Sequence, residues 1–154
     1  MTTQTAVADF LSQRSLAFIG VSRSENGFSR TAYKMLKQRG YRLFPVNPHA
    51  DTIEDDKCHH SIREIPEQVD AAVIMVPPSQ AESVIREVVD AGIRRVWIQQ
   101  GAESVAAIEY CRQHGISVIH GQCILMFAEP VESFHKLHRW VWKLLGKMSA
   151  ANGN

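Results

Sequence analysis

The sequence contains no long apolar run and no excess of charge of either sign. No apolar run approaches the ~20 residues that a helix needs to cross a bilayer, and the N-terminus MTTQTAVADF lacks the basic and apolar regions of a secretory signal. Seventeen basic and sixteen acidic residues leave a net charge of +1, so no global field favours nucleic acid or an anionic membrane. These absences predict a soluble, cytoplasmic protein that binds neither nucleic acid nor a membrane.

Regular cysteine pairs and familiar catalytic motifs are also absent. Cys58, Cys111 and Cys123 are odd in number and form no C-x-x-C pair, which favours reduced thiols over a disulfide framework. The chain has no G-x-S-x-G elbow, Walker loop or H-E-x-x-H motif. Cys58-His59-His60 offers metal-ligating side chains, but adjacent residues in an acidic loop seldom converge on one ion. We therefore expect a solvated loop there, with no catalytic group and no metal site.

The sequence does contain short apolar runs that alternate with segments of helical period. This alternation predicts a parallel sheet covered on both faces, and 154 residues with 45% hydrophobic composition suit one compact domain. The predicted strands are 16–19, 41–46, 71–76, 95–98 and 117–119. The predicted helices are 29–38, 80–90 and 104–113, each closed by a glycine, with a loop and a short helix at 61–65. The expected fold is a Rossmann-like, doubly wound, mainly parallel five-stranded α/β sheet, with its ligand at the carboxyl ends of the strands.

The first strand enters a loop opened by Gly20 and continues as a helix. Backbone N–H groups at a helix N-terminus favour a phosphate, although Ser22 stands where the dinucleotide fingerprint G-x-G-x-x-G has its second glycine. The second strand ends in Asn47-Pro48, without the acidic residue that binds the ribose of NAD. This strand end argues against ordinary NAD binding and leaves NADP and coenzyme A open.

Two further strand ends carry candidate binding residues. Pro77 and Pro78 form a stiff exit without backbone donors, which suits an apolar or amide-containing ligand but equally suits the start of a helix. Gln99, Gln100 and Gly101 offer amide groups and a close backbone approach; a simple turn before a helix would need no ligand.

Taken in order, the strand ends resemble a known family. The chain is similar to the small coenzyme A-binding proteins and, more distantly, to the coenzyme A-binding domain of the succinyl-CoA synthetase alpha subunit. The resemblance rests on LAFIGVS, GYRLFPVNP, VDAAVIMVPP, DAGIRRVWIQQGAE and GISVIHGQC, over about residues 14–126. It implies that the ADP part of coenzyme A lies near the first glycine loop and that pantetheine runs past the third and fourth strand ends. Residues 20–23 and 98–101 match family binding segments by position. With the other strand ends, the candidate cofactor-binding residues are Gly20, Val21, Ser22, Arg23, Asn47, Pro48, Val76, Pro77, Pro78, Ile98, Gln99, Gln100 and Gly101.

Some residues depart from the family pattern. The synthetase has a lysine shortly after the second strand where this chain has Ala50, so His49 or Lys57 is a candidate to assist the phosphates. The phosphorylated histidine of the synthetase belongs to a further domain, so ligation of succinate is not expected. Cys123 stands where the family often has cysteine, and both a mixed disulfide with coenzyme A and a buried structural thiol fit that position.

The C-terminal segment 131–147 predicts one more helix. Apolar residues recur there at helical spacing among basic ones, and the apolar stripe is expected to pack on the domain or at a homodimer contact. The expected organisation is an N-terminal segment 1–13, a coenzyme A-binding domain 14–130, an extra C-terminal helix 131–147 and a disordered tail 148–154.

The leading hypothesis is a module that binds coenzyme A or an acyl-CoA without catalysis, as a carrier, a sensor or an accessory unit. The alternatives are an NADP-binding or other nucleotide-binding protein, and an interaction subunit with a vestigial nucleotide site. Under the leading hypothesis, Gly20→Val should weaken coenzyme A binding by filling the space of the diphosphate.

Overall fold

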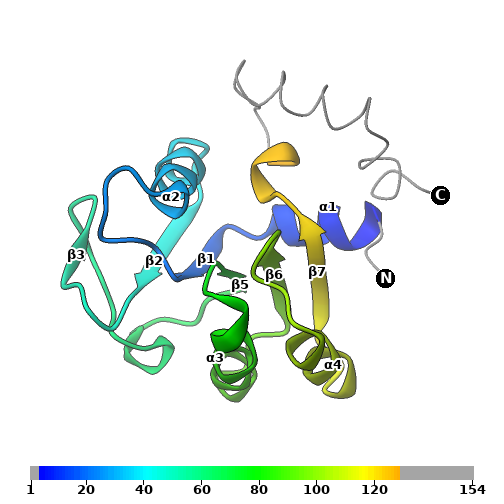
Figure 1. Ribbon diagram of the computed structural model, residues 1–154. Coiled ribbons are helices and arrows are strands. Elements are labelled where there is room, and N and C mark those ends of the chain that lie inside the picture. The colour runs from blue at the N-terminus through cyan, green and yellow to red at the C-terminus, as the bar shows by residue number, and fades with distance from the viewer. Residues whose placement is uncertain (1–3, 129–154) are drawn as a thin grey trace.

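A five-stranded parallel sheet forms the centre of the molecule (Figure 1). The computed structural model describes residues 4–128, so the predicted helix 131–147 and tail 148–154 lie outside the described residues. The strands are β1 (Ser15–Ile19), β2 (Arg42–Val46), β5 (Ala71–Ile74), β6 (Arg95–Gln99) and β7 (Ser117–Gln122). They pair in the order β2-β1-β5-β6-β7, all parallel. This doubly wound order confirms the predicted Rossmann-like α/β fold, and its switch point lies between β1 and β5.

Helices cover both faces of this sheet. The face of Leu16 and Phe18 packs against α1 (Gln4–Ser12) and α2 (Phe28–Gln38). The opposite face, with Ala17 and Ile19, packs against α3 (Pro78–Asp90) and α4 (Val105–Gln113). Figure 1 shows α3 and α4 together on one side of the sheet. Because successive strand residues are buried on opposite faces, the strands are continuous apolar runs. No helix within residues 4–128 has the length and apolarity needed to cross a membrane.

Helix α1 is one of the elements that the sequence did not predict. Its Val7 and Phe10 are buried, and the Phe10 ring meets Trp97 of β6 edge to face at 5.4 Å between centroids. The hydroxyl of Tyr41 donates to the Leu11 carbonyl at 2.8 Å. The helix has only nine residues, with no acidic side chain in its first turn and no basic side chain in its last. A helix this short is not stable by itself and is hard to recognise in a sequence. Its stability therefore comes from tertiary packing.

The segment between β2 and β5 has more structure than the loop and short helix predicted for it. A small antiparallel hairpin joins β3 (Thr52–Ile53) to β4 (Asp56–Lys57), and a 3₁₀ helix, η1 (Ile62–Glu64), follows it. The hairpin turns at Glu54 and Asp55, whose φ angles are 50° and 66°, the left-handed conformations of a tight hairpin turn. A second 3₁₀ helix, η2 (Ile124–Met126), follows β7.

Phe10→Ala should lower the free energy of unfolding by about 3–5 kcal/mol, because it removes a buried ring from the contact with Trp97. Urea unfolding measures this change. The exposed Thr5→Ala in the same helix is the control and should stay within about 0.5 kcal/mol of wild type. Equal values for the two variants would show that α1 does not contribute to the fold.

Candidate functional site

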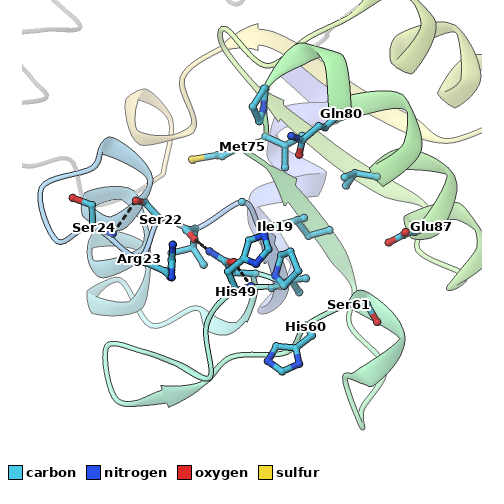
Figure 2. Close-up of a pocket in the computed structure, with 18 residues that line it drawn as sticks. Ile19, Ser22, Arg23, Ser24, His49, His60, Ser61, Met75, Gln80 and Glu87 are labelled. Carbon is cyan, nitrogen blue, oxygen red and sulfur yellow. Dashed lines mark hydrogen bonds between the residues drawn. The ribbon is translucent and has the colours of Figure 1, made fainter.

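A cavity of about 740 Å³ opens at the switch point of the sheet. It lies among the loop that follows β1, the loop that follows β2 and the segment that joins β5 to α3, which are the ends that the doubly wound fold predicts for a ligand. We refer to it as the main cavity. Figure 2 shows Ser22 and Arg23 on one side of it and Gln80 and Glu87 of α3 on the other. Eight of the candidate residues line it: Gly20, Val21, Ser22, Arg23, Asn47, Pro48, Val76 and Pro77.

A second cavity of about 360 Å³ adjoins the first and is lined by three more candidates, Gln99, Gln100 and Gly101. The two cavities share residues 75–77. Phe28, at the start of α2, forms another part of its wall and is half exposed. The structure therefore brings eleven of the thirteen candidates to two adjoining hollows.

The remaining two candidates lie elsewhere. Ile98 is fully buried in the core between the sheet and the α3–α4 layer. Pro78 is the first residue of α3 and Pro77 its N-cap, the positions where a missing N–H costs a helix nothing. The proline pair thus starts a helix, while Pro77 also faces both cavities.

Gly20 is required by the fold itself. Its φ is 98°, and a Cβ atom there would lie 2.4 Å from the carbonyl oxygen of Met75. The backbones that leave β1 and β5 therefore approach too closely for any side chain. A side chain at position 20 therefore meets the backbone of Met75, so Gly20→Val is expected to strain the fold as well as to weaken coenzyme A binding.

The loop after β1 is held by hydroxyl groups. The Ser29 hydroxyl accepts the backbone N–H of Ser22 at 2.8 Å, and the Ser22 hydroxyl accepts that of Ser24 at 3.0 Å. Each hydroxyl keeps its own proton to donate. Helix α2 has Gly27 at its N-cap, without a capping side chain, and within the described residues no hydrogen bond engages the N–H groups of Phe28 and Ser29. Unused donors therefore stand at the start of α2, as the sequence predicted, but they lie beside the second cavity.

The carbonyl groups of the same loop are also engaged by side chains. Asn47 donates from Nδ2 to the carbonyl of Val21 at 2.9 Å, and Arg30 donates from Nη1 to the carbonyls of Ser22 at 3.2 Å and Arg23 at 3.1 Å. Three consecutive peptide oxygens are thus fixed. Arg30 was not among the candidates, because nothing in the sequence distinguishes it from an exposed helical arginine.

Two amide side chains proposed as ligand groups connect parts of the protein. The Asn47 oxygen accepts the backbone N–H of His49 at 2.7 Å, so Asn47 ties the loop after β2 to the loop after β1. Gln99 is buried, and its Oε1 accepts the N–H of Ile124 at 3.1 Å. The side chain of the exposed Gln100 makes no such link within residues 4–128 and is the amide open to the second cavity.

The main cavity also contains side chains that the sequence did not assign to it. His60 and Ser61 from the polar segment after β4, and Gln80 and Glu87 from α3, line it. His49, one of the two alternatives to the missing lysine, lines it as well. His60 contacts the Asp51 carboxylate through Nε2 at 3.0 Å. The sequence signal for these residues was weak, because the segment from 49 to 70 is polar and weakly periodic.

Cys58, His59 and His60 do not point to a common centre. Cys58 and His59 are buried, and His60 is exposed. Burial raises the pKa of the Cys58 thiol and lowers the pKa of the His59 imidazole. Within residues 4–128 no three histidine, cysteine or acidic side chains form a cluster that could hold a metal ion.

Comparison with known families gives a direct match. A model described as "CoA binding domain" matches residues 14–129. The chain belongs to this CoA-binding domain family. The match confirms the resemblance that the strand ends carry, and it covers every residue that lines the two cavities.

Relatives of this CoA-binding domain protein include parts of much larger enzymes. The chain is 34% identical to the ADP-forming acetate–CoA ligase II of Archaeoglobus fulgidus over 122 residues, which cover 71% of the chain but 18% of the ligase. It is also 29% identical over 109 residues to YneT, an uncharacterized protein of Bacillus subtilis, covering 71% of the chain and 81% of that relative. A solved structure of a conserved hypothetical protein from Pyrococcus furiosus superposes with a TM-score of 0.69 at 37% identity, covering 72% of this chain and 96% of that one. The chain thus spans less than a fifth of the ligase.

The backbone contact at Gly20 can be tested with a matched glycine. Gly40 has almost the same φ, 96°, but a Cβ atom at that position would have no other atom within 4 Å. Gly40→Ala should therefore destabilise the protein by about 1–2 kcal/mol, the cost of a left-handed residue. Gly20→Ala should cost about 1–3 kcal/mol more, because the Met75 carbonyl must also move. Urea unfolding measures both, and equal losses would contradict the contact.

The three thiols should be unreactive in the folded protein. Cys58, Cys111 and Cys123 are all buried, and burial raises the pKa of Cys111 to about 11, whereas the reactive species is the thiolate. Ellman's reagent at pH 8 should label well under one thiol per native chain and all three in denaturant. Rapid labelling of one native thiol that disappears in Cys123→Ser would instead favour a mixed disulfide with coenzyme A.

Proposed function

We propose that the protein binds coenzyme A or an acyl-CoA across the two cavities. The ADP part occupies the main cavity, the diphosphate lies against the loop after β1, and the pantetheine arm crosses residues 75–77 into the second cavity. The observation that carries this proposal is the pair of adjoining hollows at the switch point, in a chain of the CoA-binding domain family.

The charges of the main cavity support this orientation. Arg23, His49 and His60 are its basic side chains, and Glu87 is the one carboxylate among the described residues that line it. The Ser22 hydroxyl retains a proton for a phosphate oxygen. At the end of β2, the Asn47 oxygen is committed to His49 and no carboxylate is offered to a ribose diol, which disfavours NAD.

The second cavity has a different chemistry that suits the pantetheine arm. Phe28, Met75 and Pro77 provide apolar wall, and none of the described residues that line the cavity has an ionisable side chain. Gln100 supplies an amide to pair with the amide groups of pantetheine. The pantetheine arm is an uncharged chain with two amides, so it fits both the apolar wall and the amide of Gln100. A nicotinamide nucleotide would instead place a second ribose and a charged pyridinium ring in the second cavity.

The role proposed for the protein is non-catalytic. The groups that line the cavities supply hydrogen-bond donors, cations and apolar surface, so we propose a carrier or sensor of coenzyme A, or an accessory unit that presents it to catalytic groups elsewhere. The similarity to 18% of an ADP-forming acetate–CoA ligase supports the accessory role.

Calorimetric titration with coenzyme A tests the proposal. We expect a dissociation constant in the micromolar range, which corresponds to a binding free energy of about −8 kcal/mol. NADP should compete weakly or not at all. No heat at near-millimolar coenzyme A would overturn the proposal, and tighter binding of NADP at the same site would favour the nucleotide-binding alternative. Native mass spectrometry of the purified protein should show a retained adduct of coenzyme A mass if the complex dissociates slowly.

A further inference from the structure

Arg30 is one of the few charged or polar residues that are buried within residues 4–128. Its side chain is 10% exposed and lies at the start of α2, behind the loop after β1. Nη1 donates to the carbonyls of Ser22 and Arg23, and Nε donates to Glu54 Oε2 at 2.8 Å. A buried guanidinium is costly unless it is paired and its donors are satisfied. Glu54 pairs with the charge and accepts from Nε, and the two loop oxygens accept from Nη1.

The two carbonyl contacts set the direction of the adjoining N–H groups. In a trans peptide the C=O and N–H bonds point in opposite directions. Because the carbonyls of Ser22 and Arg23 point to Arg30, the N–H groups of Arg23 and Ser24 point away from it. The Ser24 N–H binds the Ser22 hydroxyl, and within residues 4–128 no hydrogen bond occupies the Arg23 N–H. Arg30 therefore turns the negative ends of two peptides away from an anion that reaches this loop.

Glu54 reaches Arg30 from the β3–β4 hairpin, which is bound to α2 along its length. The Lys34 ammonium lies 3.7 Å from the Glu54 carboxylate. On β4, Asp56 accepts from Lys37 Nζ at 2.8 Å and from the Tyr33 hydroxyl at 2.5 Å. Burial and the bond to Asp56 raise the pKa of Tyr33. The hairpin thus holds the Glu54 carboxylate in a fixed place beside the guanidinium.

We propose that Arg30 and Glu54 form a positioning pair that holds residues 20–24 in the shape that binds the diphosphate of the ligand. The pair touches the loop rather than the ligand, and the inference rests on the proposed function. Glu54 fixes the guanidinium, the guanidinium fixes two carbonyls, and the fixed carbonyls leave the Arg23 N–H to the anion.

The test compares this pair with a matched pair on the surface. Arg30→Lys keeps the charge but cannot bind two carbonyls and a carboxylate in one plane, and Glu54→Gln removes the charge at the same size. Arg42 and Glu67 form an exposed ion pair outside both cavities, so Arg42→Lys and Glu67→Gln are the controls. Calorimetry with coenzyme A is carried out on variants that circular dichroism and urea unfolding show to be folded.

We expect Arg30→Lys and Glu54→Gln each to weaken coenzyme A binding about 5–20-fold, and the controls to stay within about twofold. The double variant should bind coenzyme A about as weakly as the poorer single variant, because Glu54 acts on the loop only through Arg30. Hydrogen exchange at residues 22–24 should rise in the ligand-free Glu54→Gln protein. A merely structural pair would lower the urea midpoint and leave the affinity of the folded variants unchanged.

Two outcomes overturn the inference in distinguishable ways. If the wild-type protein binds coenzyme A and both variants bind it equally well, the positioning pair is wrong and the proposed function stands. If the wild-type protein gives no binding, both fail together. Should Arg30→Lys not fold, the partly exposed Glu54→Gln decides the question alone.

Discussion

The close approach of two backbones at the switch point is the constraint on which the site depends. The chain leaves β1 at Gly20 against the Met75 carbonyl, at a distance that excludes even a Cβ atom. This approach keeps the loop after β1 beside the segment that leads into α3, so that each forms one wall of the main cavity. The same segment separates the main cavity from the second one. One glycine therefore fixes how the two hollows adjoin, and through them how an extended ligand would lie.

The polar groups of the site are ordered by side chains from several elements. Asn47 at the end of β2, Ser29 and Arg30 in α2 and Glu54 in the hairpin all bind to the loop after β1 or to one another. An anion site of this kind needs few cations of its own, because peptide dipoles oriented in advance supply much of the positive potential. This is how a chain with a net charge of +1 could form the site proposed for coenzyme A, which is a polyanion.

The sequence predicted the architecture because the signals for strands are local. All five strands, three of the helices and the ends where ligands bind follow from apolar runs, glycine stops and their alternation. Helix α1 was not predicted from the sequence because its stability comes from contacts with Trp97 and Tyr41, far along the chain. The roles of individual polar residues were not predicted for the same reason. Gln99 pairs with Ile124, 25 residues away, and Arg30 pairs with Glu54, 24 residues away. No local sequence pattern indicates such pairings.

The contacts of Ser22 show what stands in this loop in place of the missing second glycine. In the dinucleotide fingerprint the second glycine lets a phosphate approach the backbone closely. Here Ser22 occupies that place, and its hydroxyl binds the N–H of Ser24 while its carbonyl binds Arg30. The side chain of Ser22 thus belongs to the framework that holds the loop, and it keeps a proton to donate. In place of the open space of a glycine, the loop has a hydroxyl donor, and Arg30 binds the backbone carbonyl groups of Ser22 and Arg23 behind it.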